Sequence, residues 1–74
     1  MTEKTDYHKL VREVRRQLEL SQEELARELG LSFATINRWE NGQVKPSRLA
    51  RNHFHAFCDQ MEKAGRLHLA GKKK

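Results

Sequence analysis

The side chains best suited to metal binding or nucleophilic chemistry lie between residues 53 and 59. This segment contains His53, His55, Cys58 and Asp59. On a helix, His55, Cys58 and Asp59 fall at i, i+3 and i+4 and share a face. His53 is two residues from His55 and therefore points away. A closed zinc site needs four protein ligands, so we expect no metal site and no cofactor, and we expect Cys58 to be a small buried hydrophobic residue.

The size and composition of the chain limit its possible functions. With 74 residues there is room for one small domain. A pairing of Cys58 with a histidine has no accompanying oxyanion site or pocket, so we do not expect an enzyme. One cysteine excludes an internal disulfide, and no stretch resembles a signal peptide or a membrane span. These features favour a cytoplasmic location.

The positive charge is unevenly distributed along the chain. The net charge is +5, and residues 42–74 carry eight Lys or Arg against two Asp or Glu, whereas residues 1–41 carry seven against eight. A positive excess favours an anionic partner. Recognition within the first 41 residues must therefore depend on specific side chains and not on overall charge.

Four helices are predicted from apolar periodicity and capping residues. Ser21 and Glu24 have the spacing of a capping box, Gly30 can end the helix that they begin, and Ser32 can cap the next one. The predicted helices span residues 7–19, 22–29, 33–41 and 47–64.

No segment carries a strand signal, so the predicted fold class is all-α. We expect residues 1–6 to be a flexible amino terminus and residues 7–64 to be the domain. Residues 65–74 are Lys-rich and lack periodicity, which predicts a basic flexible tail.

Residues 22–41 have the pattern of two short helices that cross at a tight turn. Their sequence is QEELARELGLSFATINRWEN. Ala26 must be small where the helices approach, and Gly30 lets the chain reverse with a positive φ. The apolar residues expected to fill the space between the helices are Leu25, Leu29, Leu31, Ile36 and Trp39.

The wider segment LSQEELARELGLSFATINRWENGQVKPS resembles the lambda-repressor/Cro-like helix-turn-helix family, also called the xenobiotic-response-element type. The resemblance covers residues 8–50 and rests on SQEELA, the LGLS turn and RWENG followed by Pro46. It implies a small helix-turn-helix bundle. Family members usually turn after a short fourth helix and add a fifth, but here AFCDQMEKAG continues without a breaker, so we expect four, possibly five, helices. It also implies that helix 33–41 lies in the major groove of double-stranded DNA while the preceding helix crosses the backbone.

The resemblance implies a bacterial or phage transcriptional regulator, for which we expect repression ahead of activation. The alternative is a protein-interaction module, or the antitoxin of a toxin–antitoxin pair, built on the same fold. Asn37 and Arg38 can both form hydrogen bonds to base edges, and this favours DNA binding over the alternative.

Helix 33–41 presents a polar face opposite its apolar side, and we expect this face to contact bases. Arg38 can make a bidentate contact to guanine and Asn37 to adenine. Phe33 and Ala34 can pack against a thymine methyl group, although Phe33 could instead fold back onto the core.

Contacts to the DNA backbone are expected from donors near helix ends, where free amides attract phosphate. Gln22 and Asn41 match the family's phosphate-contacting positions. Ser32 could serve only as a cap, and the loop cations could be solvated surface. The expected phosphate-contacting residues are Gln22, Ser32, Thr35, Asn41, Lys45 and Arg48.

The resemblance further suggests that Arg15 and Glu40 meet as a partly buried ion pair that braces the third helix against the first. We also expect a homodimer, because symmetric operators require two copies of the reading helix. The stripe formed by Phe54, Phe57 and Met61 is broad enough to form the interface, or it could simply cap the core.

Overall fold

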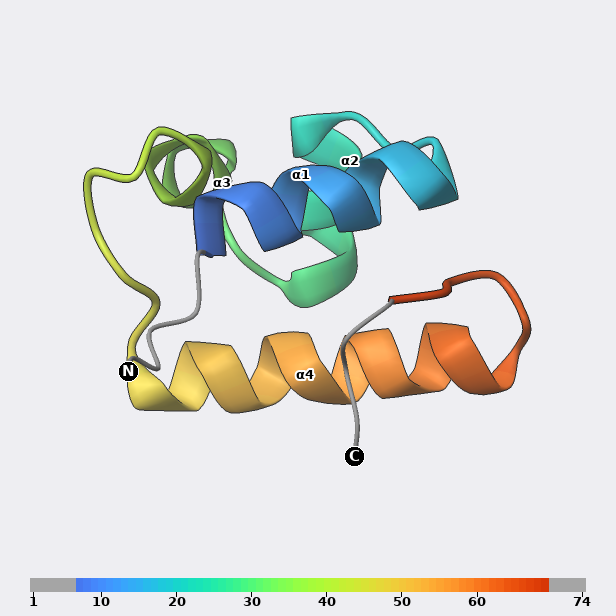
Figure 1. Ribbon diagram of the computed structural model, residues 1–74. Helices are drawn as coiled ribbons and strands as arrows, with labels where there is room; N and C mark the ends of the chain where they lie inside the picture. Colours follow the sequence, from blue (N-terminus) through green and yellow to red (C-terminus); the bar gives the residue numbers. More distant parts are fainter. Residues whose placement is uncertain (1–6, 70–74) are drawn as a thin grey trace.

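Four helices, with no strand among the described residues, make up the computed structural model, which describes residues 7–69 (Figure 1). The all-α prediction is confirmed, and each predicted helix end lies within one residue of the observed end. The predicted amino terminus, residues 1–6, and the end of the predicted tail, residues 70–74, lie outside the described residues. The helices are α1 (Tyr7–Leu18), α2 (Gln22–Leu29), α3 (Phe33–Glu40) and α4 (Arg48–Lys63).

The start of α2 is fixed by a reciprocal capping box. The Glu24 amide donates to Ser21 Oγ at 3.0 Å, and the Ser21 amide donates to Glu24 Oε1 at 2.8 Å. The end of α2 is fixed by Gly30, whose φ of 70° lies in the left-handed region that glycine adopts without strain. These local contacts set the tight turn that leads into α3.

The core is built around Phe54 of α4, which is fully buried. Its ring makes edge-on contacts with Tyr7 of α1 and Trp39 of α3, at centroid distances of 6.4 and 6.2 Å. Helix α3 packs against both α1 and α2, and α4 runs beneath all three (Figure 1). The remaining buried apolar residues are Val11, Val14, Leu18, Leu25, Ala26, Leu29, Ile36, Phe57, Cys58 and Leu67.

The chain after α4 returns to the core, so the prediction of a flexible tail from residue 65 is wrong for residues 65–69. Leu67 is 1% exposed, and it belongs to the core cluster. Two hydrogen bonds join the Gln17 side chain to the backbone of His68. Gln17 Nε2 donates to the His68 carbonyl at 2.8 Å, and the His68 backbone amide donates to Gln17 Oε1 at 2.7 Å. In Figure 1 the segment reverses after α4 and passes between α4 and α1. A single leucine in an aperiodic segment gives no sequence signal of burial.

The apolar stripe of α4 is covered within one chain, which corrects the surface expected for a dimer. Phe54 is fully buried, Phe57 is buried, and Met61 packs against the core as a partly buried residue. The returning segment explains this cover, because Leu67 and Leu69 join the same cluster. The stripe therefore caps the core of one chain and is not a free surface.

Within residues 7–69, no helix combines the length and the apolar character that crossing a membrane requires.

Candidate DNA-binding interface

The exposed face of α3 brings together the four residues expected to contact bases. Ile36 and Trp39 are buried and fix the opposite side of the helix in the core. Arg38 and Ala34 are exposed and Asn37 is half-buried. Phe33 is 49% exposed, so its ring lies at the surface and not in the core. The result is an outward face with one cation, one amide and two apolar groups.

Ser32 caps α3 in the structure. Its Oγ accepts a hydrogen bond from the Thr35 amide at 3.1 Å and lies 2.9 Å from the Thr35 hydroxyl. Both side chains are therefore engaged with each other at the start of the helix. The capping role expected as the alternative for Ser32 is present.

The carboxylate of Glu40, at the end of α3, is almost fully buried. Arg15 of α1 meets it in a bidentate pair, with Nε donating to Oε2 at 2.6 Å and Nη2 donating to Oε1 at 2.9 Å. A third bond from Arg15, from Nη1 to the Leu20 carbonyl at 3.2 Å, ties the same guanidinium to the chain before α2. This geometry braces α3 against α1 and the α1–α2 connection.

Gln22 at the start of α2 also binds Glu40. Its Nε2 donates to Glu40 Oε1 at 3.0 Å. The side chain expected to contact phosphate is thus held by the same carboxylate that Arg15 holds. Sequence reasoning did not anticipate this contact, since it joins residues 18 positions apart.

The protonation of Glu40 follows from these contacts. Burial raises its pKa, but hydrogen bonds from Arg15 and Gln22 and the charges of Arg15 and Arg12 outweigh burial and hold the pKa below 4.5. The hydrogen bond to Glu40 raises the pKa of Arg15 above its usual value. The pair is therefore ionised at neutral pH.

Arg12 is a residue of this cluster that sequence reasoning missed. Its Nη2 donates to the backbone carbonyl of Glu40 at 3.2 Å, and its Nε lies 3.9 Å from Glu40 Oε1. The available sequence signal was its spacing, because Arg12 precedes Arg15 by three residues and so shares a face of α1 with it.

The remaining predicted phosphate contacts lie along the exposed connection from α3 to α4. Asn41 is the C-cap of α3, Lys45 lies in the loop, and Arg48 begins α4, all with exposed side chains. No acidic residue occurs between Glu40 and Asp59. This stretch is therefore uniformly neutral or basic.

The elements gather these residues in two groups. Gln22 is hydrogen-bonded to the carboxylate of Glu40, and Asn41 follows Glu40 in the chain. Lys45 and Arg48 follow α3 along the connection to α4, and the side chains expected to contact bases lie on α3 between its capped start and Asn41.

The histidine and cysteine segment forms no such cluster. Cys58 is buried at 1% exposure, which confirms its expected role as a small core residue. Among the described residues, no group of three or more His, Cys, Asp or Glu is arranged to hold a metal ion. Tyr7 Oη lies 3.0 Å from His55 Nε2, which links the start of α1 to α4.

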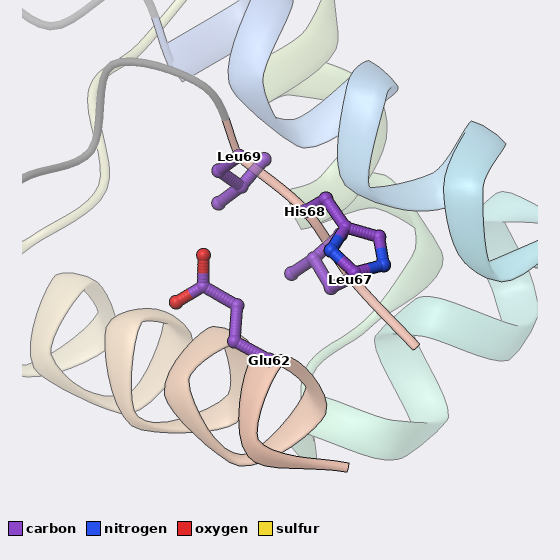
Figure 2. Close-up of a pocket in the computed structure, with 4 residues that line it drawn as sticks. All are labelled: Glu62, Leu67, His68 and Leu69. Atoms are coloured by element: carbon purple, nitrogen blue, oxygen red, sulfur yellow. The ribbon is translucent and has the colours of Figure 1, made fainter. Parts of the chain in front are cut away.

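An open pocket lies between the end of α4 and the returning segment (Figure 2). It is lined by Glu62, Leu67, His68 and Leu69. None of these belongs to the predicted interface, and the lining has one carboxylate and one imidazole but no hydroxyl or thiol nucleophile.

Two short helices joined at a glycine turn, with the second exposing a polar face over a buried apolar side, define a helix-turn-helix domain. The family model described as Helix-turn-helix matches residues 11–49, more than half of the 74 residues. The chain therefore belongs to the Cro/C1-type, lambda-repressor-like helix-turn-helix family, a family of DNA-binding regulators. No curated protein and no solved structure matches the chain.

Proposed function

We propose that this protein is a sequence-specific regulator of transcription that binds double-stranded DNA and reads the major groove with α3. The observation that carries the proposal is the exposed face of α3, where Arg38 and Asn37 lie opposite the buried Ile36 and Trp39. Such a face is rigidly positioned by the core and bears the donors that base edges require.

Base reading in this proposal belongs to four side chains. Arg38 contacts guanine and Asn37 contacts adenine, each bidentate contact discriminating by about 1–3 kcal/mol against the wrong base. The exposed ring of Phe33 and the methyl group of Ala34 pack against thymine methyl groups.

Contacts to phosphate are proposed at the end of α3, along its connection to α4, and at its start. Gln22 and Asn41 orient the backbone at the end of α3, while Lys45 and Arg48 supply positive charge along the connection. The uniformly neutral or basic stretch between Glu40 and Asp59 supports this assignment. Ser32 and Thr35 contribute hydroxyl groups at the start of the helix.

We propose repression as the mode of regulation, in a bacterial or phage cytoplasm, because occupying an operator is sufficient to block transcription. The polar face of α3 favours DNA over the alternative of a protein-binding or antitoxin module, for which that face needs no base-reading donors.

A homodimer remains part of the proposal, since a two-fold operator presents two half-sites. The α4 stripe is unavailable for the interface, so the contact must involve another surface. Sedimentation at micromolar concentration, alone and with duplex DNA, tests the assembly. Monomer in both conditions contradicts it.

Binding of the protein to random-sequence duplex DNA over a range of salt concentrations tests the proposed function. We expect the logarithm of the affinity to fall linearly with the logarithm of the salt concentration, because each phosphate contact releases counterions. Absence of binding at about 50 mM salt, or binding indifferent to salt, would contradict the proposal.

A further inference from the structure

A second guanidinium lies beside the buried carboxylate of Glu40. Arg15 already engages both carboxylate oxygens, at 2.6 and 2.9 Å. Arg12 donates instead to the backbone carbonyl of Glu40 at 3.2 Å, and its Nε lies 3.9 Å from Oε1. One carboxylate therefore faces two guanidinium groups, and the cluster has one positive charge in excess.

Arg12 lies next to two of the proposed phosphate contacts. The carbonyl to which it donates belongs to the peptide that joins Glu40 to Asn41. The carboxylate oxygen near its Nε also accepts the hydrogen bond from Gln22. Helices α1 and α2 thus place a cation and an amide side chain against Glu40, and Asn41 follows Glu40 directly in the chain.

Most of the Arg12 side chain faces solvent. It is 59% exposed, whereas the Arg15 side chain is 26% exposed. A guanidinium has five N–H donors, and only one of them, on Nη2, donates to a described residue. Donors therefore remain for an external acceptor, while the bond to Glu40 limits where the group can move.

The proposed contacts near Arg12 lack charge. Gln22 and Asn41 are neutral amides, which orient a phosphate but do not replace its counterions. Lys45 and Arg48 lie beyond α3. A cation beside the two amides supplies what this end of the interface otherwise lacks.

We propose that Arg12 is a further phosphate-binding residue, which neutralises the DNA backbone phosphate that Gln22 and Asn41 orient. This inference rests on the proposed function, because it requires DNA to approach the start of α2 and the end of α3. Glu40 acts as a positioning residue, since its carbonyl and carboxylate hold Arg12 and Gln22 side by side.

The experiment compares the salt dependence of binding to a random-sequence duplex for the wild type, Arg12→Gln, Arg12→Lys and Arg16→Gln. Arg16 is the matched control, because it lies on the same helix, is 71% exposed and pairs with Glu13 at 2.6 Å, away from Glu40. We expect Arg12→Gln to bind several-fold more weakly at low salt and to lower the magnitude of the log–log slope by about 0.9. Arg12→Lys keeps the charge and should keep the slope, as should Arg16→Gln.

Two results overturn the inference and are distinguishable from each other. If the wild type binds with the expected salt dependence but Arg12→Gln has the same slope as the wild type, Arg12 does not contact phosphate and the proposed function stands. If the wild type shows no salt-dependent binding, the proposed function fails and the inference fails with it. Thermal melting accompanies every variant, and Arg12→Ala provides a second charge-removing variant should Arg12→Gln be unstable.

Discussion

At the scale of single residues, Glu40 has the most consequential environment. A carboxylate that is almost fully buried is tolerated only when its oxygens are paired and hydrogen-bonded. Arg15 and Gln22 meet this requirement with three hydrogen bonds. Because these partners come from α1 and α2, the stability of the fold and the position of α3 depend on the same side chain.

Arg15→Ala is expected to destabilise the fold strongly. It leaves the buried Glu40 carboxylate without its bidentate partner, and breaking such a pair costs about 3–5 kcal/mol when both groups are buried. We expect a loss of stability near the lower of these values, because Arg15 is only half-buried and Gln22 still donates a hydrogen bond to Glu40. Arg16→Ala is the control, because its pair with Glu13 is solvent-exposed, so removing it should change stability far less. Chemical denaturation measures both, and equal effects would refute the bracing role.

The pH dependence of stability follows from the pKa of Glu40. Because its folded-state pKa lies below the ordinary 4.5, its contribution is complete above that pH and is lost as pH falls through the folded value. Hydrogen bonds from Arg16 and Gln17 lower the pKa of Glu13 to about 2, so protonation of Glu13 at low pH also reduces stability. We expect the free energy of unfolding to fall between about pH 5 and pH 2, less steeply in Glu40→Gln than in the wild type. Denaturant titrations across this range, with Glu23→Gln as control, test this; equal slopes in the wild type and Glu40→Gln would contradict it.

How far the site could be predicted differs among its residues. The outward face of α3 was predictable, because helical periodicity places Phe33, Asn37 and Arg38 opposite the apolar side. The contacts of Glu40 with Gln22 and Arg12 were not, because they join residues 18 and 28 positions apart and depend on how three helices cross.

At the scale of elements, short helices need their caps. Helix α3 has eight residues, and Ser32 supplies the only side-chain cap at its start. Helix ends were predictable because capping is local in sequence, as the Ser21–Glu24 box also illustrates. The return of residues 65–69 to the core was not predictable. It depends on hydrogen bonds with Gln17, which is far away in the sequence, and on burial of Leu67 in the core.

Substitutions of Ser32 should separate capping from DNA contact. Ser32→Ala removes the acceptor for the Thr35 amide and should cost about 1 kcal/mol of stability. Ser32→Asp retains a strong N-cap acceptor but places a negative charge where we propose a phosphate. It should melt near the wild-type temperature and bind DNA much more weakly. Wild-type affinity in Ser32→Asp would contradict a phosphate near the start of α3.

At the scale of the whole molecule, the core closes only when the chain returns after α4. Leu67 belongs to the same core cluster as Phe57 and Cys58, and hydrogen bonds from Gln17 hold the returning segment to α1. The domain therefore extends beyond the family match at residues 11–49, and its stability depends on residues outside the helix-turn-helix itself.

Leu67→Ala is expected to lower stability by about 2–5 kcal/mol, the usual cost of removing a buried leucine side chain. Leu49→Ala is the matched control, since Leu49 is exposed and its loss should change stability by no more than about 0.5 kcal/mol. Thermal or chemical unfolding of the two variants measures the difference. Similar stabilities would show that the returning segment does not belong to the core.

At this scale, we propose that recognition is divided between α3, which reads bases, and the following loop, which attracts the DNA backbone. Selection of bound sequences from a random duplex library, with the wild type, Arg38→Ala and Lys45→Ala, tests this division most directly. We predict that Arg38→Ala loses the preference at one base pair, while Lys45→Ala keeps every preference and binds all sequences more weakly. The same change in both variants, or no sequence preference in the wild type, would contradict it.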